Sequence, residues 1–115
     1  MKRVDKPWGY ELWWAQTDKY VGKILHVNAG ERLSLQYHNE KDETLYLLKG
    51  EMDMQYGASA EQLETKRMHE GDTHYNPPLM VHRMIAITDV DMLEVSTPQV
   101  EDVVRLEDAY GRSDK

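Results

Sequence analysis

The sequence predicts an all-β fold, a small barrel or sandwich built from about nine short strands. Three observations support this prediction. Polar and apolar residues alternate with a period of two in short segments, turn residues separate these segments, and no long stretch has the apolar spacing of a helix. Short strands at this spacing within 115 residues are typical of sandwiches and small barrels.

Each expected strand is an alternating segment that ends at turn residues. In chain order the expected strands are Tyr10–Ala15, Tyr20–Val27, Arg32–His38, Glu43–Leu48, Glu51–Tyr56, Gln62–His69, Thr73–Asn76, His82–Ile87 and Met92–Ser96. Gly, Pro, Asn and Asp are frequent in the breaks between them. Residues 100–110 are expected to form a short helical turn, because Val103, Val104 and Leu106 could share one helix face, with Gly111 ending it.

Length and composition limit the protein class. With 115 residues, the chain is expected to form a single domain over residues 1–115. The absence of cysteine excludes disulfides, thiolate metal sites and a cysteine nucleophile. The longest stretch without a charged residue, 73–82, is too short to cross a bilayer, and the first residues lack the apolar core of a signal peptide. We therefore expect a soluble, cytoplasmic protein with no membrane partner.

The charge distribution and the alternation of side chains along one strand indicate which partners the protein can bind. The net charge is -7, and no Lys/Arg cluster interrupts the acidic body, which argues against a nucleic-acid partner. In the segment 43–48 both faces are largely apolar, so both are expected to be covered. Either Trp13 and Trp14 of the same chain or a second subunit could form the outer cover. A homodimer is the expected assembly.

The first stretch that could carry chemistry runs from Gly30 to Gly50. On a strand, Gln36 and His38 point to the same side, and Glu40 would join them if the strand extended that far. The turn at 39–42 would bring Glu43 beside His38. Unpaired polar groups inside a barrel cost on the order of 1–3 kcal/mol each, and a bound cation removes that cost.

The second stretch runs from Gly71 to Arg83 and contains two prolines, Pro77 and Pro78, that fix a turn before His82. If the strand of His82 neighbours that of His38, two histidines and Glu43 form a metal site with Gln36 as a fourth, oxygen ligand. Alternatively, Gln36 pairs with backbone groups of the barrel wall. Imidazole and carboxylate ligands suit one divalent metal ion, with Zn expected first and Mn, Ni, Co or Fe as alternatives.

The two stretches together resemble the cupin family of small β-barrels. The first cupin motif is matched in every spacing: Gly30, five residues, Gln36-Tyr37-His38, four residues, Glu43, six residues, Gly50. The second is matched as Gly71, five residues, Pro77-Pro78-Leu79, two residues, His82, three residues, Ala86. Gln36 replaces the expected first His, Leu79 replaces a Gly and Ala86 replaces an Asn. The resemblance implies a double-stranded β-helix, or jelly-roll, barrel, with motifs at about residues 30–50 and 71–86.

Within the cupins, the chain resembles the cupin domain of type II mannose-6-phosphate isomerases. The resemblance rests on the opening Lys6–Glu11, the run Gly30–Gln36, the pair His82-Arg83 and the closing Asp102–Arg112. In that family a Gln followed two residues later by His supplies metal ligands, so the resemblance implies that Gln36, His38, Glu43 and His82 bind the metal. The sugar nucleotidyltransferase domain of the bifunctional members has no counterpart in this sequence, so a stand-alone cupin is expected.

The resemblance implies an aldose-ketose isomerase acting on a sugar phosphate. Glu40 and Arg83 are the candidate catalytic residues, Glu40 as the proton carrier, and Arg83 could also hold the phosphate. Arg32 and Lys23 are further candidates for binding the substrate phosphate. A surface carboxylate is the alternative interpretation of Glu40. Two other functions remain open: a cupin that binds a metal or sugar without turnover, and a non-haem Fe(II) dioxygenase. The histidines without motif support are His26, His69 and His74.

Overall fold

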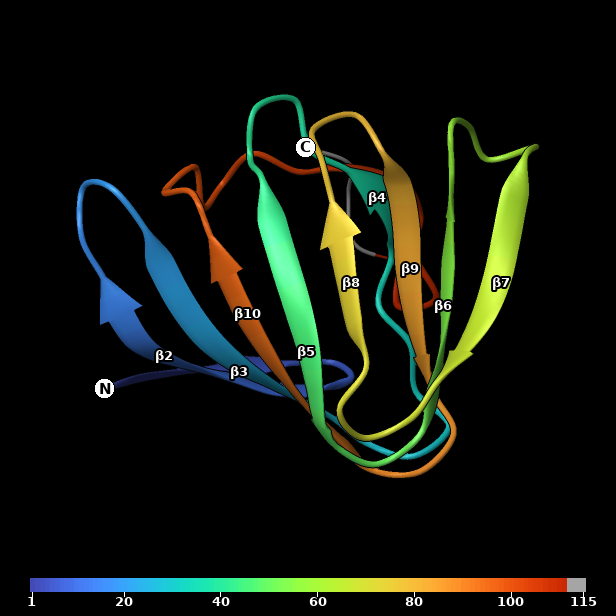
Figure 1. The fold of residues 1–115 in the computed structure, drawn as a ribbon, viewed down its shortest axis with the longest axis horizontal. Coiled ribbons are helices and arrows are strands. Elements are labelled where there is room, and N and C mark those ends of the chain that lie inside the picture. The colour runs from blue at the N-terminus through green and yellow to red at the C-terminus, as the bar shows by residue number, and fades with distance from the viewer. Residues whose placement is uncertain (112–115) are drawn as a thin grey trace.

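Eleven β-strands in two antiparallel sheets form the fold in the computed structural model, which describes residues 1–111 (Figure 1). The strands are β1 (Lys2–Lys6), β2 (Gly9–Gln16), β3 (Val21–Val27), β4 (Leu35–Tyr37), β5 (Glu43–Lys49), β6 (Met52–Gly57), β7 (Leu63–Met68), β8 (Thr73–Asn76), β9 (Val81–Ala86), β10 (Val90–Ser96) and β11 (Val104–Glu107). One sheet has the order β1-β2-β3-β10-β5-β8 and the other β11-β4-β9-β6-β7. The crossovers between neighbouring strands are those of a jelly roll, so the all-β prediction is confirmed.

All nine strands expected from alternation are present, with ends shifted by a few residues. The largest shift is at β4, which has three residues where the alternation indicated a strand from Arg32 to His38. Residues 32–34 instead run beside β9 with a single bridge between Arg32 and Ile85. The expected bounds of β8 are those observed.

The two ends of the described chain differ from the sequence prediction. No helical turn forms at residues 100–110: Val104–Glu107 is strand β11, which pairs with β4 through Val104 opposite Tyr37. A free strand edge at β4 satisfies the backbone groups of this segment, and tertiary pairing thus overrides a weak local helical pattern. β1 was not expected because four of its five residues are charged. Arg112, the last residue of the motif quoted above, lies outside the described residues.

The interior changes character along the strands. Apolar side chains fill one end, and five methionines are buried there: Met52, Met54, Met68, Met84 and Met92. Towards the other end the inward-facing residues become polar. On β5, for example, Leu47 and Leu45 are followed by Glu43, all three facing inward and buried. One end of the barrel is therefore a dry core and the other a polar cavity.

The outer face of the six-stranded sheet is apolar and uncovered. Tyr46 and Leu48 on β5 are exposed, which differs from the expected cover on both faces of this strand. Trp14 lies over Gly22 of β3 on the same sheet but leaves β5 uncovered. Among residues 1–111, no helix is long and apolar enough to cross a membrane.

Candidate metal centre

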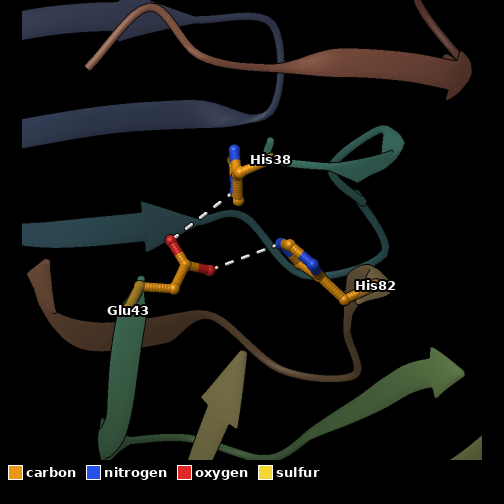
Figure 2. Close-up of side chains that lie close together, drawn as sticks. All are labelled: His38, Glu43 and His82. Atoms are coloured by element: carbon orange, nitrogen blue, oxygen red, sulfur yellow. Dashed lines mark ion pairs between the residues drawn. The ribbon is translucent and has the colours of Figure 1, made fainter. Parts of the chain in front are cut away.

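Three buried side chains converge inside the polar end of the barrel (Figure 2). Glu43 begins β5, His82 is the second residue of β9, and His38 directly follows β4. β4 and β9 are paired through Gln36 and His82, which brings the two histidines together across the five-stranded sheet. One ligand atom from each of the three residues lies within 4.8 Å of the other two. The turn at 39–42 places Glu43 opposite them, on the other sheet.

Both histidines point their Nε2 atom towards Glu43. The Nδ1 atom of His38 lies 2.5 Å from the carbonyl oxygen of Asp102, and that of His82 lies 3.0 Å from the carbonyl oxygen of Met80. A carbonyl only accepts hydrogen bonds, so each Nδ1 carries a proton and donates it. In the neutral imidazole the lone pair is then on Nε2, the usual arrangement in metal-binding histidines.

The glutamate faces both free nitrogens. His82 Nε2 is 3.3 Å from Glu43 Oε2, and His38 Nε2 is 3.8 Å from Glu43 Oε1 (Figure 2). The Lys41 ammonium contacts Glu43 Oε1 from one side, but the two nitrogen lone pairs still face the carboxylate and repel it unless a positive charge also lies between them. A proton on one Nε2 or a metal cation would supply that charge, and the set of two nitrogens and one oxygen is a common one for divalent metals. The residues present therefore fit a bound metal ion.

Neighbouring groups adjust the protonation of the cluster. Burial by itself would raise the pKa of Glu43. The hydrogen bond that His82 donates when its Nε2 is protonated, and the charge of Lys41, outweigh burial and hold that pKa well below its ordinary value. Burial lowers the pKa of His38, an effect that Glu43 only partly offsets. At neutral pH the carboxylate is thus ionised and the His38 ring is neutral, which are the forms that bind a metal.

Residues around the cluster fix its orientation. Asn76, fully buried on β8, donates from Nδ2 to Glu43 Oε2 at 3.0 Å, and its Oδ1 accepts from His74 Nε2 at 2.8 Å. The Asp102 carboxylate accepts hydrogen bonds from the backbone amides of the turn at 39–41. Although burial would raise the pKa of Asp102, these bonds lower it to about 2. Asn76 therefore fixes the orientation of the Glu43 carboxylate, and Asp102 fixes the turn that follows His38.

The cluster opens onto a cavity of about 130 Å³ between the two sheets. Five of its lining residues are cations, and three are glutamates. The cations are Lys6, Lys23, Lys41, Arg83 and Arg105, and the glutamates are Glu11, Glu43 and Glu94. Although the chain as a whole carries a net charge of -7, the cavity has more positive than negative side chains. Local charge of this sign favours an anionic ligand.

The structure places some predicted site residues in this cavity and others outside it. Gln36 lines the cavity; its Nε2 donates to Ser34 Oγ at 2.9 Å, so its oxygen is the atom left for a ligand. Arg83 also lines it and donates to Glu107 at 2.8 Å. Lys23 is buried at its wall, 3.4 Å from Glu11 and over the Trp13 ring.

Glu40 and Arg32 do not line the cavity, and both are exposed. Strand β4 ends at Tyr37, so Glu40 lies in the following turn instead of continuing the inward-facing side of the strand. Arg32 precedes β4 at the bridge to Ile85, near the apolar end of the interior. The strand is therefore too short to bring Glu40 beside Gln36 and His38, and its exposed position agrees with the alternative interpretation of Glu40 as a surface carboxylate.

Sequence reasoning missed a buried ion-pair row beside the cluster. Lys41 Nζ lies 3.2 Å from Glu43 Oε1 and 3.0 Å from Glu94 Oε2. Burial alone would lower the pKa of Lys41, but Glu94 and Glu43 raise it above its ordinary value, so the ammonium stays charged. Strand parity could have indicated Glu94, because it shares the inward side of β10 with Met92. Nothing in the local sequence indicates that Lys41 is buried.

Comparisons with known proteins agree with the fold and the motifs. The Xanthan biosynthesis protein XanB of Xanthomonas campestris pv. campestris is 26% identical over 117 residues, which are 97% of this chain and 24% of that protein. The chain thus spans about a quarter of the length of this curated relative. KdgF from Halomonas sp. superposes with a TM-score of 0.76 at 18% identity, over 86% of this chain and 87% of KdgF.

Bacillus subtilis oxalate decarboxylase, in a structure that concerns its Mn(II) centres, superposes with a TM-score of 0.78 at 20% identity. The superposition covers 92% of this chain and 30% of the decarboxylase, and at this identity it supports the fold alone. The family model of the cupin domain matches residues 23–96, which include His38, Glu43 and His82. Two sheets in jelly-roll order, both motif spacings and this match together show that the chain belongs to the cupin domain family.

Proposed function

We propose that the protein is a metal-dependent sugar-phosphate isomerase, resembling the mannose-6-phosphate isomerases, that interconverts mannose 6-phosphate and fructose 6-phosphate. The observation that carries this proposal is the position of the cluster of His38, Glu43 and His82 inside a cavity with five cationic side chains. The cluster suits a divalent metal, and the cations suit a phosphorylated substrate. Gln36 would be the fourth ligand through its oxygen.

Such an isomerisation moves a proton between two adjacent carbons while negative charge develops on the neighbouring oxygens. A divalent metal bound at the cluster supplies Lewis-acid stabilisation of that charge. Lys41 remains protonated and can donate hydrogen bonds to a substrate oxygen. Glu94 is buried in the cavity wall beside Lys41, so it is better placed than the exposed Glu40 to carry the proton.

The substrate phosphate needs cations that can reach the cavity. Arg105 lines it from β11, where it is the cross-strand neighbour of Gln36. Arg83 lines it from β9. A guanidinium can hold a phosphate through two parallel hydrogen bonds, so we assign the phosphate first to Arg105. Arg83 is a further candidate, but its guanidinium already donates to Gln55 and Glu107. Lys23 has Glu11 as its counter-ion and contributes less. Arg32 has no part in this arrangement because it lies outside the cavity.

A cupin that binds a metal or sugar without turnover is the second candidate. It is favoured by one observation: the only glutamates lining the cavity are Glu43, in the cluster, and Glu94 and Glu11, each in an ion pair with a lysine. No carboxylate among the lining residues is therefore without a counter-ion. Glu11 and Glu94 each already contact a lysine ammonium, so neither is an unpaired base facing the substrate.

The test is metal analysis followed by an isomerase assay with mannose 6-phosphate. We expect the wild-type protein to bind one divalent ion per chain and to form fructose 6-phosphate. Glu43→Gln should lose both metal and activity, whereas Glu61→Gln, at an exposed position, should lose neither. Metal binding without turnover of any aldose or ketose phosphate would support the binding protein instead. Iron with oxygen uptake would support a dioxygenase.

We also propose a homodimer that buries the apolar outer face of the six-stranded sheet, on the side of the sheet opposite the cavity. Tyr46 on β5, Val95 on β10 and Tyr75 on β8 are all exposed there. Thr44 lies between Val95 and Tyr75 in register, so the three strands present one continuous surface. Contiguous exposed apolar surface of this kind is typical of interfaces.

A further inference from the structure

Asp102 contacts two parts of the metal cluster at once. Its carboxylate accepts hydrogen bonds from the backbone amides of Asn39 at 2.9 Å, Glu40 at 2.6 Å and Lys41 at 2.9 Å. Its backbone carbonyl oxygen is the acceptor for His38 Nδ1. One residue thus holds the ring of His38 and the turn that leads from His38 to Glu43.

Two further contacts tie the same segments together. The Asp42 amide donates to Thr97 Oγ1 at 2.9 Å, and the Thr97 amide donates to the Asp42 carbonyl at 3.0 Å. The chain from Thr97 to Asp102 therefore runs along the whole turn at 39–42. Thr97 and Asp102, which make these contacts, lie beyond residue 96, where the match to the cupin domain model ends.

The turn has few other backbone partners. It joins β4 to β5, which belong to different sheets, so no strand pairing connects its amides to a neighbour. Three consecutive amides that point at one carboxylate form a rigid cradle, because each bond fixes the direction of one peptide plane. Without the carboxylate, these amides would bond to water and the turn could move.

We propose that Asp102 is a positioning residue of the metal centre, which sets the distance between His38 and Glu43 by clamping the turn that connects them. This inference rests on the proposed metal binding of the cluster. Asp102 does not touch the metal position itself; it acts through His38 and through the turn. The segment after β10 is therefore part of the metal site.

The test measures Co²⁺ affinity and the visible Co²⁺ spectrum in the full chain. Asp102→Ala removes all carboxylate acceptors, and Asp102→Asn keeps one oxygen but turns an NH₂ group towards amide donors. The matched control is Asp89→Ala, because Asp89 Oδ1 also accepts a long-range bond from a backbone amide, that of Ala29, at 2.8 Å. Asp89 lies in the turn between β9 and β10, at the opposite end of the barrel (Figure 1).

We expect the Co²⁺ dissociation constant to rise by roughly 10–100-fold in Asp102→Ala, the usual effect of removing a group that orients a ligand, and by less in Asp102→Asn. The Co²⁺ spectrum should change in both variants and stay unchanged in Asp89→Ala. In metal-free protein, hydrogen exchange of the amides at 39–41 should be faster in both Asp102 variants. If Asp102→Ala does not fold, Asp102→Asn carries the test.

The outcomes separate the two proposals. A wild-type chain that binds no Co²⁺ would overturn the proposed metal function and this inference with it. Wild-type binding with an unchanged dissociation constant and spectrum in the folded Asp102 variants would overturn the inference alone. A lower melting temperature with unchanged Co²⁺ binding would make Asp102 a merely structural residue and would also overturn it.

Discussion

At the residue scale, the contacts of His38 determine which form of its ring is present. The Asp102 carbonyl fixes the proton on Nδ1, and burial makes a second proton on Nε2 costly. A neutral ring with its lone pair on Nε2 is what a divalent metal requires. The protein therefore keeps this ligand ready at neutral pH, without first having to remove a proton from it.

This arrangement predicts the titration of His38. Because burial lowers the folded-state pKa of His38 below its ordinary 6.5, the folded state binds fewer protons than the unfolded state as the pH falls below 6.5. The contribution of this residue to stability is therefore present above that pH and lost as acid protonates the unfolded chain. Nitrogen-15 NMR of the metal-free protein should show the Nδ1-protonated ring at pH 7 and a midpoint below 6.5. A midpoint above 6.5, or a ring protonated on Nε2, would contradict the contacts described.

The same residues show what the sequence could and could not predict about the site. Motif spacing and turn positions were enough to predict that His38, Glu43 and His82 lie close together. Both interpretations of Glu40, inward-facing or on the surface, stayed open because a period-two pattern cannot show where β4 ends. Asp102 and Lys41 act through contacts with the backbone and with buried carboxylates from distant segments, and no local spacing encodes such contacts.

At the element scale, the turn between β8 and β9 positions His82 and contains one strained residue. Leu79 stands where the cupin motif has glycine, and it has a φ of 72°, the only positive φ among the non-glycine residues described. Its amide donates to the His38 carbonyl at 2.7 Å, and the next residue, Met80, accepts from His82. The turn thus needs a left-handed residue at this point, whichever side chain is present.

This strain predicts that Leu79→Gly stabilises the protein. The left-handed conformation costs a residue with a side chain roughly 1–2 kcal/mol, which glycine avoids. Glycine also has more conformational freedom in the unfolded chain, and this reduces the gain in stability by roughly 0.4–1 kcal/mol. Leu79 is 61% exposed, so little apolar burial is lost. The free energy of unfolding in urea should rise by about 0.5–1 kcal/mol.

The control is Leu106→Gly, which changes an exposed leucine in β11, away from the outer face of the six-stranded sheet. That variant should lose about 1 kcal/mol, because glycine weakens a strand and no strain is relieved. Equal losses in both variants would show that Leu79 is not strained.

The strands show the same limits of sequence prediction. Alternation was enough for β2, β3 and β5–β10, where one face meets the interior and the other does not. β1 and β11 are edge strands whose residues gain little from burial, so their sequences carry little alternation. Their positions follow from free hydrogen-bonding edges on β2 and β4, which only the assembled sheets provide.

At the scale of the whole molecule, the exterior and the cavity carry charge of opposite sign, and several exposed apolar residues gather on one face. The net charge of -7 belongs to the exterior, whereas the cavity lining has five cations and three glutamates. An acidic exterior lowers the attraction of anions to the surface in general, so a phosphorylated ligand is favoured only within the cavity. The outer face of the six-stranded sheet is the exception to the polar exterior.

That face predicts a dimer that can be measured. Burying apolar area on both copies is favourable by about 25 cal/mol per Å², and specific dimers bury more than about 1,000 Å² in total. Light scattering after size exclusion should therefore give twice the chain mass of 13.5 kDa at micromolar concentration. Val95→Lys should shift the protein to the monomer, because the dimer would bury two uncompensated charges.

Ile87→Lys is the matched control, since Ile87 is an exposed apolar residue in the turn after β9, away from the outer face of β5 and β10. It should leave the mass unchanged. Circular dichroism should be the same for all three proteins, which separates loss of the interface from loss of the fold. A wild-type mass of 13.5 kDa, or dissociation by Ile87→Lys but not by Val95→Lys, would contradict burial of this face. Because the cavity opens between the sheets and the apolar face lies on the outside, Val95→Lys should also retain Co²⁺ binding as a monomer.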